Sequence, residues 1–184
     1  NTLIPFEYTD VKMYSQGVCV KQNERWGYIS LVDDHTIPCA YSGLWAIDQN
    51  TDFVLAMQDM NYGILTTAGE VIIPFEYGEM RIFNDFIIAH KENGYGLLNF
   101  AGEMIKPFEY SEIDETGVSE GIAVKAAKSD GTGSEILIVR EGVPATLCVV
   151  EGTYKDIALY ENTNADNGEG SAWVISATKD GRYY

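Results

Sequence analysis

The sequence predicts an all-β chain made of tandem repeats of about 33 to 36 residues, each a β-hairpin unit with three strands. The first observation behind this fold class is a recurring tetrapeptide. Pro-Phe-Glu-Tyr occurs at residues 5–8, 74–77 and 107–110, and a degraded copy, Pro-Cys-Ala-Tyr, lies at 38–41. Successive prolines of these motifs are 33, 36 and 33 residues apart, a period typical of chains that stack one small supersecondary unit.

Two further marks repeat with the same period. An aromatic residue followed by glycine occurs at Trp26-Gly27, Tyr62-Gly63 and Tyr95-Gly96. Each of these glycines lies 11 residues before the proline of the next motif. An apolar residue also lies three positions after each motif tyrosine, at Val11, Leu44, Met80, Ile113 and Ile157. The last of these positions indicates a fifth, degraded unit around Tyr154.

The elements of one unit follow in a fixed order, as the second repeat shows. An apolar run at 53–56 precedes a polar turn at 59–61, the aromatic-glycine strand at 62–65, a second turn at 68–70 and the proline strand at 72–74. Short runs that are rich in β-branched and aromatic residues and bounded by Gly, Asn or Asp are typical of strands in hairpins. No window carries a helical periodicity long enough to compete.

This pattern resembles the WG-repeat family of bacterial proteins, whose units carry a Trp-Gly or Tyr-Gly strand, a glycine turn and an Ile-Pro-x-x-Tyr segment. Residues 26–29, 69–77 and 102–110 carry the resemblance, which covers about residues 1–125. Residues 126–184 keep only the Tyr154 and Ile157 marks and an apolar run. The resemblance implies a repeat scaffold and no particular reaction.

We expect one repeat domain over residues 1–184. Its units, of which the last two are degenerate, fall at approximately 1–27, 28–63, 64–96, 97–140 and 141–184. Because residues 1–4 align with 70–73, the chain begins inside a unit. Two arrangements stay open at this point. One is an open β-repeat array cut from a longer one, and the other is a closed, propeller-like ring of roughly five blades.

Each repeat mark has a physical reason. Glycine inside a strand weakens it unless a close contact needs it, so we expect a backbone or ring of the next unit to approach the glycine that follows the aromatic. Proline lacks an N–H and is expected at a strand end or a bulge. Gly69 and Gly102 fit turn positions with positive φ, and Asp33 tolerates the same conformation in the first full unit. We expect most burial to occur between neighbouring units.

The formal net charge of −16, from 28 acidic and 12 basic residues, limits the classes of partner. It argues against nucleic acid and anionic membranes, because phosphate contacts need lysine and arginine. The apolar runs are strand-sized, so neither a signal peptide nor membrane insertion is expected. The compartment stays open, with the bacterial cell envelope or secretion favoured slightly over the cytoplasm.

Few residues suit catalysis. His35 and His90 fall at different repeat positions and share no hairpin, so they are interpreted as surface or rim residues. Cys19 and Cys39 align with apolar positions and are interpreted as small core side chains, while Cys148 has no counterpart. The cysteine spacing predicts neither a disulfide nor a metal site, and no nucleophile motif is visible. The sequence therefore predicts no catalytic residue and no cofactor.

Carboxylates and amides supply the remaining metal candidates. The motif glutamates are expected to be solvated residues beside the core; they are Glu7, Glu76 and Glu109. Asn162, Asn164 and Asp166 alternate as ligands do in a calcium loop, and they are weak calcium candidates. Their glycine comes one residue late, and Trp173 occupies the place of the bidentate glutamate. A surface loop is the simpler interpretation.

Aromatic residues outside the repeat marks are candidates for a ligand or partner surface; they are Trp45, Tyr14, Tyr160 and Trp173. Exposed aromatics can stack on sugar rings or anchor a peptide, and otherwise these residues pack between units. The sequence is interpreted as a non-enzymatic scaffold that binds a protein partner, with enlarged loops at 126–135 and 161–171. The alternative is a carbohydrate- or cell-envelope-binding module. A hydrolase on a propeller scaffold needs a closed ring with carboxylates on its axis.

Overall fold

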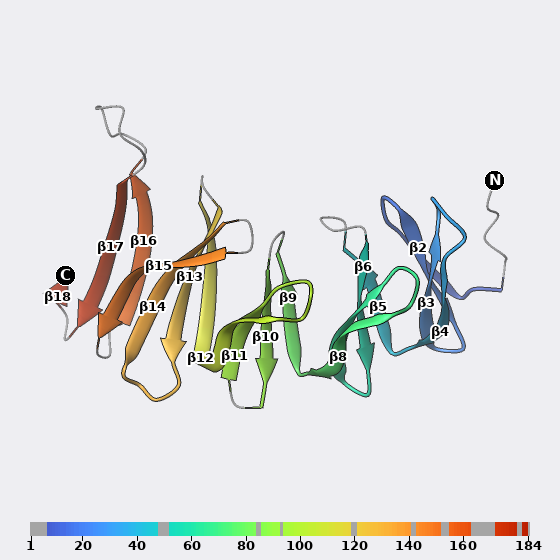
Figure 1. The fold of residues 1–184 in the computed structure, drawn as a ribbon, viewed down its shortest axis with the longest axis horizontal. Coiled ribbons are helices and arrows are strands. Elements are labelled where there is room, and N and C mark those ends of the chain that lie inside the picture. The colour runs from blue at the N-terminus through green and yellow to red at the C-terminus, as the bar shows by residue number, and fades with distance from the viewer. Residues whose placement is uncertain are drawn as a thin grey trace. The chain divides into compact units, whose positions relative to one another are not determined.

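The computed structural model describes the backbone of residues 7–47, 52–83, 86–92, 94–118, 121–140, 143–151, 155–162, 172–179 and 182–183. It describes side chains within these ranges up to residue 115, and for residues 126–136, 176 and 182. Every regular element in these ranges is a β-strand, so the predicted all-β class is confirmed (Figure 1). The chain divides into two compact units, residues 1–92 with 97–106 and residues 93–96 with 107–184.

The strands form four sheets, each with a linear strand order, as expected for a β-repeat array. The first sheet is β1 (Asp10–Met13), β2 (Gly17–Gln22), β3 (Arg25–Ser30) and β4 (Thr36–Tyr41). The second is β5 (Gly43–Ala46), β6 (Phe53–Gln58), β7 (Asn61–Thr66) and β8 (Val71–Tyr77). Both are antiparallel meanders in which each strand pairs with the next one along the chain.

The third sheet has seven strands in the order β15-β14-β13-β12-β11-β10-β9, and the fourth has the order β16-β17-β18. The third sheet consists of β9 (Glu79–Ile82), β10 (Ile87–Lys91), β11 (Gly94–Leu98), β12 (Met104–Val118), β13 (Gly121–Lys128), β14 (Gly133–Arg140) and β15 (Val143–Glu151). The fourth consists of β16 (Lys155–Asn162), β17 (Ala172–Lys179) and β18 (Arg182–Tyr183). None of these orders closes into a barrel, and the ring alternative stays a prediction.

The first two sheets contain the three predicted strands of each repeat and one more. The predicted strands are β2, β3 and β4 in the first sheet and β6, β7 and β8 in the second. The additional strand, β1 or β5, holds the apolar repeat mark that follows the motif tyrosine, Val11 or Leu44. At four residues it is too short for a period-of-two pattern to predict it from the sequence.

The predicted polar turns between the first two predicted strands of each repeat are two-residue hairpin loops. Asn23 and Glu24 join β2 to β3 with φ of 50° and 62°, and Asp59 and Met60 join β6 to β7 with φ of 49° and 67°. Positive φ at both central residues defines the type I′ turn, whose twist matches that of the flanking strands. Glycine favours this conformation, so these side chains are held in a costly region of the backbone map.

The second turn of each repeat follows the prediction in two cases and departs from it in one. Gly69 and Gly102 have φ of +91° and +79°, as predicted. Asp33, however, does not adopt positive φ, so that prediction was wrong. The Asp33 Oδ1 instead accepts a hydrogen bond from the backbone N–H of His35 at 3.0 Å. In the first sheet the backbone N–H of Ser30 donates to the carbonyl of His35, whereas in the second sheet the N–H of Thr66 donates to the carbonyl of Glu70. The turn in the first sheet therefore closes one residue later and needs no left-handed residue.

A bulge in the proline strand explains both the proline and the glycine of the repeat. In the second sheet Tyr62 pairs with Tyr77 and Ile64 with Ile73, so three residues that begin with Pro74 lie opposite Gly63. A Cβ on Gly63 would lie 2.7 Å from the carbonyl oxygen of Ile73 and 2.9 Å from the ring of Phe75. The predicted bulge and close approach are confirmed, although the approaching backbone belongs to the adjoining strand of the same sheet.

The first sheet repeats this arrangement. Trp26 pairs with Tyr41 and Tyr28 with Ile37, and a Cβ on Gly27 would lie 2.5 Å from the Ile37 carbonyl oxygen. The glycine of the aromatic-glycine mark is therefore required because the bulged strand folds over it. An alanine at this position would force the two strands apart.

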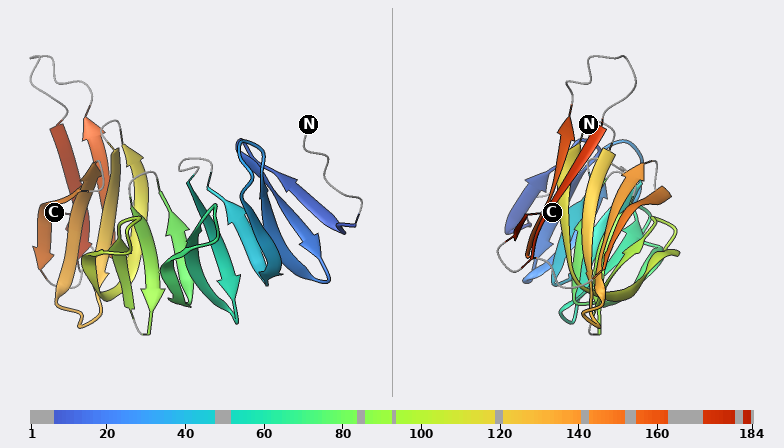
Figure 2. Two further views of the ribbon diagram at one scale, coloured as in Figure 1. Left: turned by 45° about the vertical axis from the view of Figure 1, so that its right-hand side comes forward. Right: turned by 90° about the vertical axis from the view of Figure 1, so that its left-hand side faces the viewer.

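The core between the first two sheets forms as stacked repeats predict. It gathers buried residues of both sheets: Cys19, Trp26, Tyr28 and Ile37 from the first, and Leu44, Val54, Ala56 and Leu65 from the second. The sheets lie side by side within one compact unit, drawn in blue and blue-green (Figure 2). Cys19 is fully buried here, which confirms its interpretation as a small core side chain.

Candidate interaction surface

The face of the first sheet that points away from the second sheet carries a group of apolar residues on β1, β2 and β3. Val11 pairs with Val20 across β1 and β2, and Met13 pairs with Val18, so each pair shares one face of the sheet. Because Cys19 lies between Val18 and Val20 and points into the core, these residues point to the opposite side. Ile29 pairs with Val18 and joins them. We call this set the outer face: Val11, Met13, Val18, Val20 and Ile29.

Burial on the outer face is uneven. Val18 and Val20 are buried, whereas Met13 is 65% exposed and Val11 is 42% exposed. Two further apolar side chains are exposed in the turn after β3, Leu31 at 40% and Val32 at 66%. Exposed apolar side chains that lie together on a protein surface are typical of contact sites.

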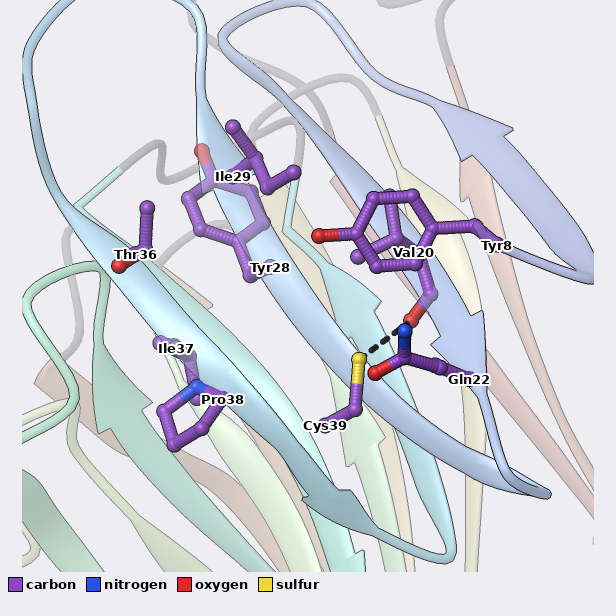
Figure 3. Close-up of a pocket in the computed structure, with 9 residues that line it drawn as sticks. All are labelled: Tyr8, Val20, Gln22, Tyr28, Ile29, Thr36, Ile37, Pro38 and Cys39. Atoms are coloured by element: carbon purple, nitrogen blue, oxygen red, sulfur yellow. Dashed lines mark hydrogen bonds between the residues drawn. The ribbon is translucent and has the colours of Figure 1, made fainter. Parts of the chain in front are cut away.

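A pocket of about 340 Å³ opens on the same sheet (Figure 3). It is lined by Tyr8, Val20, Gln22, Tyr28, Ile29, Thr36, Ile37, Pro38 and Cys39. Tyr8 precedes β1 and reaches over β2, with its hydroxyl directed towards β3 (Figure 3). The thiol of Cys39 donates a hydrogen bond to the backbone carbonyl of Val20, with sulfur and oxygen 3.7 Å apart. This bond runs from β4 to β2 across β3, at the point where β3 has Gly27.

The pocket exists because a small residue replaces a large one in the repeat. Cys39 occupies the motif position that Phe75 holds in the second sheet, and Tyr8 occupies the position of Tyr41. The ring of Tyr41, from the first sheet, stacks on that of Phe75, from the second, with centroids 5.8 Å apart. A thiol beside Tyr8 fills less space than a phenyl ring, so the volume that Phe75 occupies in the next repeat is open here.

The ionisable groups of the pocket remain neutral near pH 7. Burial raises the pKa of the Cys39 thiol and, together with the nearby Cys39, that of the Tyr8 hydroxyl. A thiol whose pKa is raised by burial is a poor nucleophile, because the thiolate is the reactive form. The pocket is therefore suited to apolar contact and to neutral hydrogen bonds.

Charged residues border the exposed apolar side chains in the sequence. Asp33 and Asp34 directly follow Val32, and both are exposed. Hydrogen bonds with Ser30 and with the backbone of His35 lower the pKa of Asp33, so its carboxylate keeps its charge in mildly acid solution. These carboxylates favour a partner with basic groups at the edge of the contact.

Of the aromatic candidates, Trp45 and Tyr14 have described side chains. The Trp45 ring lies against Gly43 and has its centroid 6.2 Å from that of Tyr62. Lys12 holds the equivalent repeat position in the first sheet, and its Nζ lies 4.5 Å from the centroid of the Trp26 ring. In both sheets this position therefore contacts the repeat aromatic, by a tilted ring contact for Trp45 and by a cation–π contact for Lys12.

Tyr14 is half-buried and packs against the core between the first two sheets. Tyr160 lies in β16 opposite Val174, and Trp173 lies in β17 opposite Glu161, but their side chains lie outside the described residues. Of the four predicted aromatics, the structure describes the side chains of Trp45 and Tyr14, and neither lies on the outer face. It places Trp45 and Tyr14 at contacts within the first compact unit.

The other candidates are placed as follows. His35, in the turn before β4, has its Nδ1 3.2 Å from the Oδ2 of Asp33, and His90 lies in β10 of the seven-stranded sheet. The motif glutamates are exposed, as predicted; they are Glu7, Glu76 and Glu109. Asn164 and Asp166 lie outside the described residues, as does the side chain of Asn162. Among the described side chains no three acidic, histidine or cysteine groups gather as a metal site.

The outer face and its pocket were not predicted from the sequence. Val11 was recognised only as a repeat mark, and Met13 and Tyr8 were not singled out. A comparison of equivalent repeat positions finds this surface. Val11 takes the position of Leu44, and Leu44 is only 1% exposed whereas Val11 is 42% exposed. In the part of the chain that the structure describes, no helix is long and apolar enough to cross a membrane.

Residues 62–94 match the family model described as a WG containing repeat. This segment is therefore similar to a WG repeat. It includes Tyr62-Gly63, the turn glycine Gly69 and the motif 74–77, which are the marks traced above. The WG repeat thus has a physical basis in this chain, because its glycine lies under a bulge that its proline permits.

No curated protein matches the chain. Among solved structures, the N-terminal domain of Nup159 is similar with a TM-score of 0.39 and 10% identity, over 93% of this chain and 57% of that one. PorZ, a surface component of the type-IX secretion system of Porphyromonas gingivalis, is similar with a TM-score of 0.33 and 12% identity, over 84% of this chain and 30% of that one. The chain thus spans less than two thirds of either structure, and likenesses this weak support no statement about it.

Proposed function

We propose that this chain is a non-enzymatic repeat scaffold that binds another protein through the outer face of its first sheet. The observation that carries the proposal is the exposure of Met13 and Val11 beside Val18 and Val20, which are apolar and buried on the same sheet face. Protein interfaces combine an apolar centre with a polar edge. Exposed Leu31 and Val32, followed by two aspartates, extend the apolar surface and supply part of such an edge.

The chemistry of the described residues supports binding more than catalysis. Burial raises the pKa of the Cys19 thiol to about 11, and burial likewise raises that of Cys39, so neither provides a thiolate near pH 7. His35 is paired with Asp33 on an exposed turn, where water competes with any bound substrate. Because the recurring residues of the repeat serve packing, the turns and the exposed part of the sheet face are the surfaces that can bind another molecule.

The test compares Met13→Glu with Met60→Glu as a matched control. Met60 is 83% exposed in the turn between β6 and β7, and glutamate already occupies the equivalent position as Glu24. Immobilised wild-type chain and both variants are exposed to a lysate of the source cells, and any captured protein is purified and titrated against each. Wild type and Met60→Glu should bind it alike, and Met13→Glu should bind at least about tenfold more weakly, since burying a charge is costly.

Two results would count against the proposal. One is equal binding by Met13→Glu, which would place the contact elsewhere. The other is turnover of any substrate class that is lost on replacing His35 or His90, which would make the chain an enzyme.

A carbohydrate- or cell-envelope-binding role is the second candidate. The observation that favours it is the pair of half-buried rings of Trp45 and Tyr62, whose planes are tilted by 33°. Aromatic faces of this kind can stack on sugar rings. Binding on a glycan array or to peptidoglycan that Trp45→Ala weakens without unfolding the chain would support it, and no binding to any glycan would exclude it.

A further inference from the structure

We infer that the pocket beside Cys39 receives one aromatic side chain of the partner protein, a phenylalanine or tyrosine that lies next to a basic residue. This inference rests on the proposed function, because it names the residue by which the partner is anchored. It is carried by the repeat, since the equivalent position of the second sheet shows which side chain fills this space.

In the second sheet a ring occupies the position of Cys39. This residue is Phe75, and its ring stacks on that of Tyr41 with centroids 5.8 Å apart and planes 28° apart. Tyr8 takes the position of Tyr41 in the preceding motif, and it lines the pocket together with Cys39 (Figure 3). A phenyl ring in the pocket would therefore meet Tyr8 as Phe75 meets Tyr41, in a stacked contact that the chain already uses.

The pocket has room for such a ring and an apolar base to receive it. Its volume is about 340 Å³, and an apolar cavity of roughly 150 Å³ is enough to bind benzene. The buried residues among those that line it are Val20, Tyr28 and Ile37, none more than 3% exposed. The remaining lining residues are half-buried or exposed, so a side chain can enter from the surface.

The position of the pocket favours a side chain of a protein over a free small molecule. Val20 and Ile29 belong both to the pocket lining and to the outer face. Val20 pairs across the strands with exposed Val11, so one partner can fill the pocket and also cover Val11 and Met13. Interfaces are commonly held by a few aromatic anchors in pockets, with weaker contacts around them. A free ring would leave Val11 and Met13 exposed.

Electrostatics decide which residues accompany the ring. None of the described residues that line the pocket is charged near pH 7, so an ionised side chain inside it would lose its hydration without gaining a charged partner. Burial raises the pKa of the Cys39 thiol and of the Tyr8 hydroxyl, and the nearby Glu7 carboxylate raises both further. Glu7 is exposed, so it favours a basic residue beside the ring and opposes an acidic one.

The first experiment uses a blocked dipeptide, acetyl-Phe-Lys-amide, as the probe. It is titrated into the ¹⁵N-labelled chain while the amide resonances of Val20 and Cys39 are followed by NMR. Acetyl-Ala-Lys-amide lacks the ring and should bind at least about tenfold more weakly, because burial of the phenyl group is lost. Acetyl-Phe-Glu-amide reverses the charge and should also bind more weakly. No saturable shift with acetyl-Phe-Lys-amide, or equal binding by either control dipeptide, overturns the inference.

Two variants test whether the dipeptide lies in the pocket. Cys39→Phe places a ring there from within the chain and should abolish the saturable shifts. Ala40→Phe adds the same side chain at the next, exposed position and should bind as wild type does. Equal loss of binding in both variants, or full binding by Cys39→Phe, would place the dipeptide elsewhere and overturn the inference.

Changes at Tyr8 test the stacked contact itself. Tyr8→Phe keeps the ring and should bind the dipeptide as wild type does. Tyr8→Leu keeps an apolar side chain without a ring and should bind about fivefold or more weakly, because a stacked aromatic pair contributes beyond its buried area. Equal binding by the two variants would show that stacking on Tyr8 does not hold the ring, and it too would overturn the inference.

The second experiment uses the captured protein of the proposed function, and it separates the two ideas. Cys39→Phe should weaken the binding of that protein by about tenfold or more, and Ala40→Phe should not. Weakening by Met13→Glu but not by Cys39→Phe leaves the proposed function standing and removes the inference. Weakening by Cys39→Phe but not by Met13→Glu does the reverse. Dipeptide binding with no protein captured would assign the ring to a free small molecule and overturn the inference.

Discussion

Replacing Gly63 with alanine tests the physical reason for the glycine of the repeat. The new Cβ would lie 2.7 Å from the carbonyl oxygen of Ile73 and 2.9 Å from the Cδ1 of Phe75. Real Cβ atoms do not approach neighbours this closely, so the bulged strand or the ring has to move. The ring can shift at modest cost, but the carbonyl belongs to β8, which pairs with β7 on both sides of the bulge.

The expected cost follows from two opposing effects. Overpacking a well-packed site by one methyl group destabilises a protein by about 1–3 kcal/mol. Replacing glycine by alanine also restricts the unfolded chain, which returns about 0.4–1 kcal/mol. The clash exceeds the entropic gain, so we expect Gly63→Ala to lower the free energy of unfolding by about 1–2 kcal/mol.

Gly78→Ala provides the control, and urea unfolding provides the measurement. A Cβ on Gly78 would have the Nδ1 of His90 as its nearest neighbour at 3.8 Å, an ordinary contact, so this variant should equal or slightly exceed wild type in stability. In a Phe75→Ala background the cost of Gly63→Ala should fall, because one of the two close contacts is gone, but it should not vanish. If Gly63→Ala and Gly78→Ala unfold at the same urea concentration, the close approach does not explain the glycine.

Three other changes have expected outcomes. Met60→Gly should raise stability by about 0.5–1 kcal/mol in urea unfolding, because it removes a side chain from positive φ, and Met60→Ala should give no such gain. Cys39→Phe should fill the pocket, stack on Tyr8 and raise the free energy of unfolding by about 1 kcal/mol or more. Ala40→Phe, at an exposed position, is the control. A loss of stability in Cys39→Phe, or an equal gain in Ala40→Phe, would contradict the origin given for the pocket. Burial raises the pKa of Cys19 from 9.0 to about 11, so the stability that its neutral thiol contributes is complete below pH 9 and is lost as the pH rises through 11. Over this range the free energy of unfolding of wild type should fall by roughly 3 kcal/mol relative to that of Cys19→Ala. Parallel pH profiles of the two proteins would refute this expectation.

The sequence predicted those parts of the fold that depend on local pattern and on repetition. The strands β2, β3 and β4, the hairpin turns, the bulged proline and the positive φ of Gly69 all follow from residue types that recur at one period. The prediction for Asp33 failed because turn conformation depends on where the turn closes as well as on residue type. The turn from Ser30 closes at His35, one residue later than the equivalent turn from Thr66 to Glu70, and this wider turn needs no positive φ. The additional strand β1 escaped prediction because its four residues, although alternately polar and apolar, are the shortest run that can indicate a strand.

The candidate site was harder to predict than the fold, for a reason that Val11 and Leu44 illustrate. The two residues hold the same repeat position and are both apolar, and only their surroundings differ. Exposure is a property of the neighbouring sheet, which the sequence of a unit does not specify. Trp45 shows the same effect, because its aromatic type suggested a ligand surface whereas its repeat position, shared with Lys12, places it over Tyr62.

Departures from the repeat therefore indicate the candidate surface better than residue chemistry does. Where a position keeps its type and its burial, as Leu65 does opposite the first sheet, it is explained by stacking. Where it keeps its type but is exposed, as Val11 is, or where a thiol replaces a ring, as at Cys39, stacking within the described sheets does not account for it. Both departures lie on the first sheet, one at the edge strand β1 and the other in the pocket beside Cys39, so a comparison of the two sheets position by position locates the candidate surface where residue chemistry alone did not.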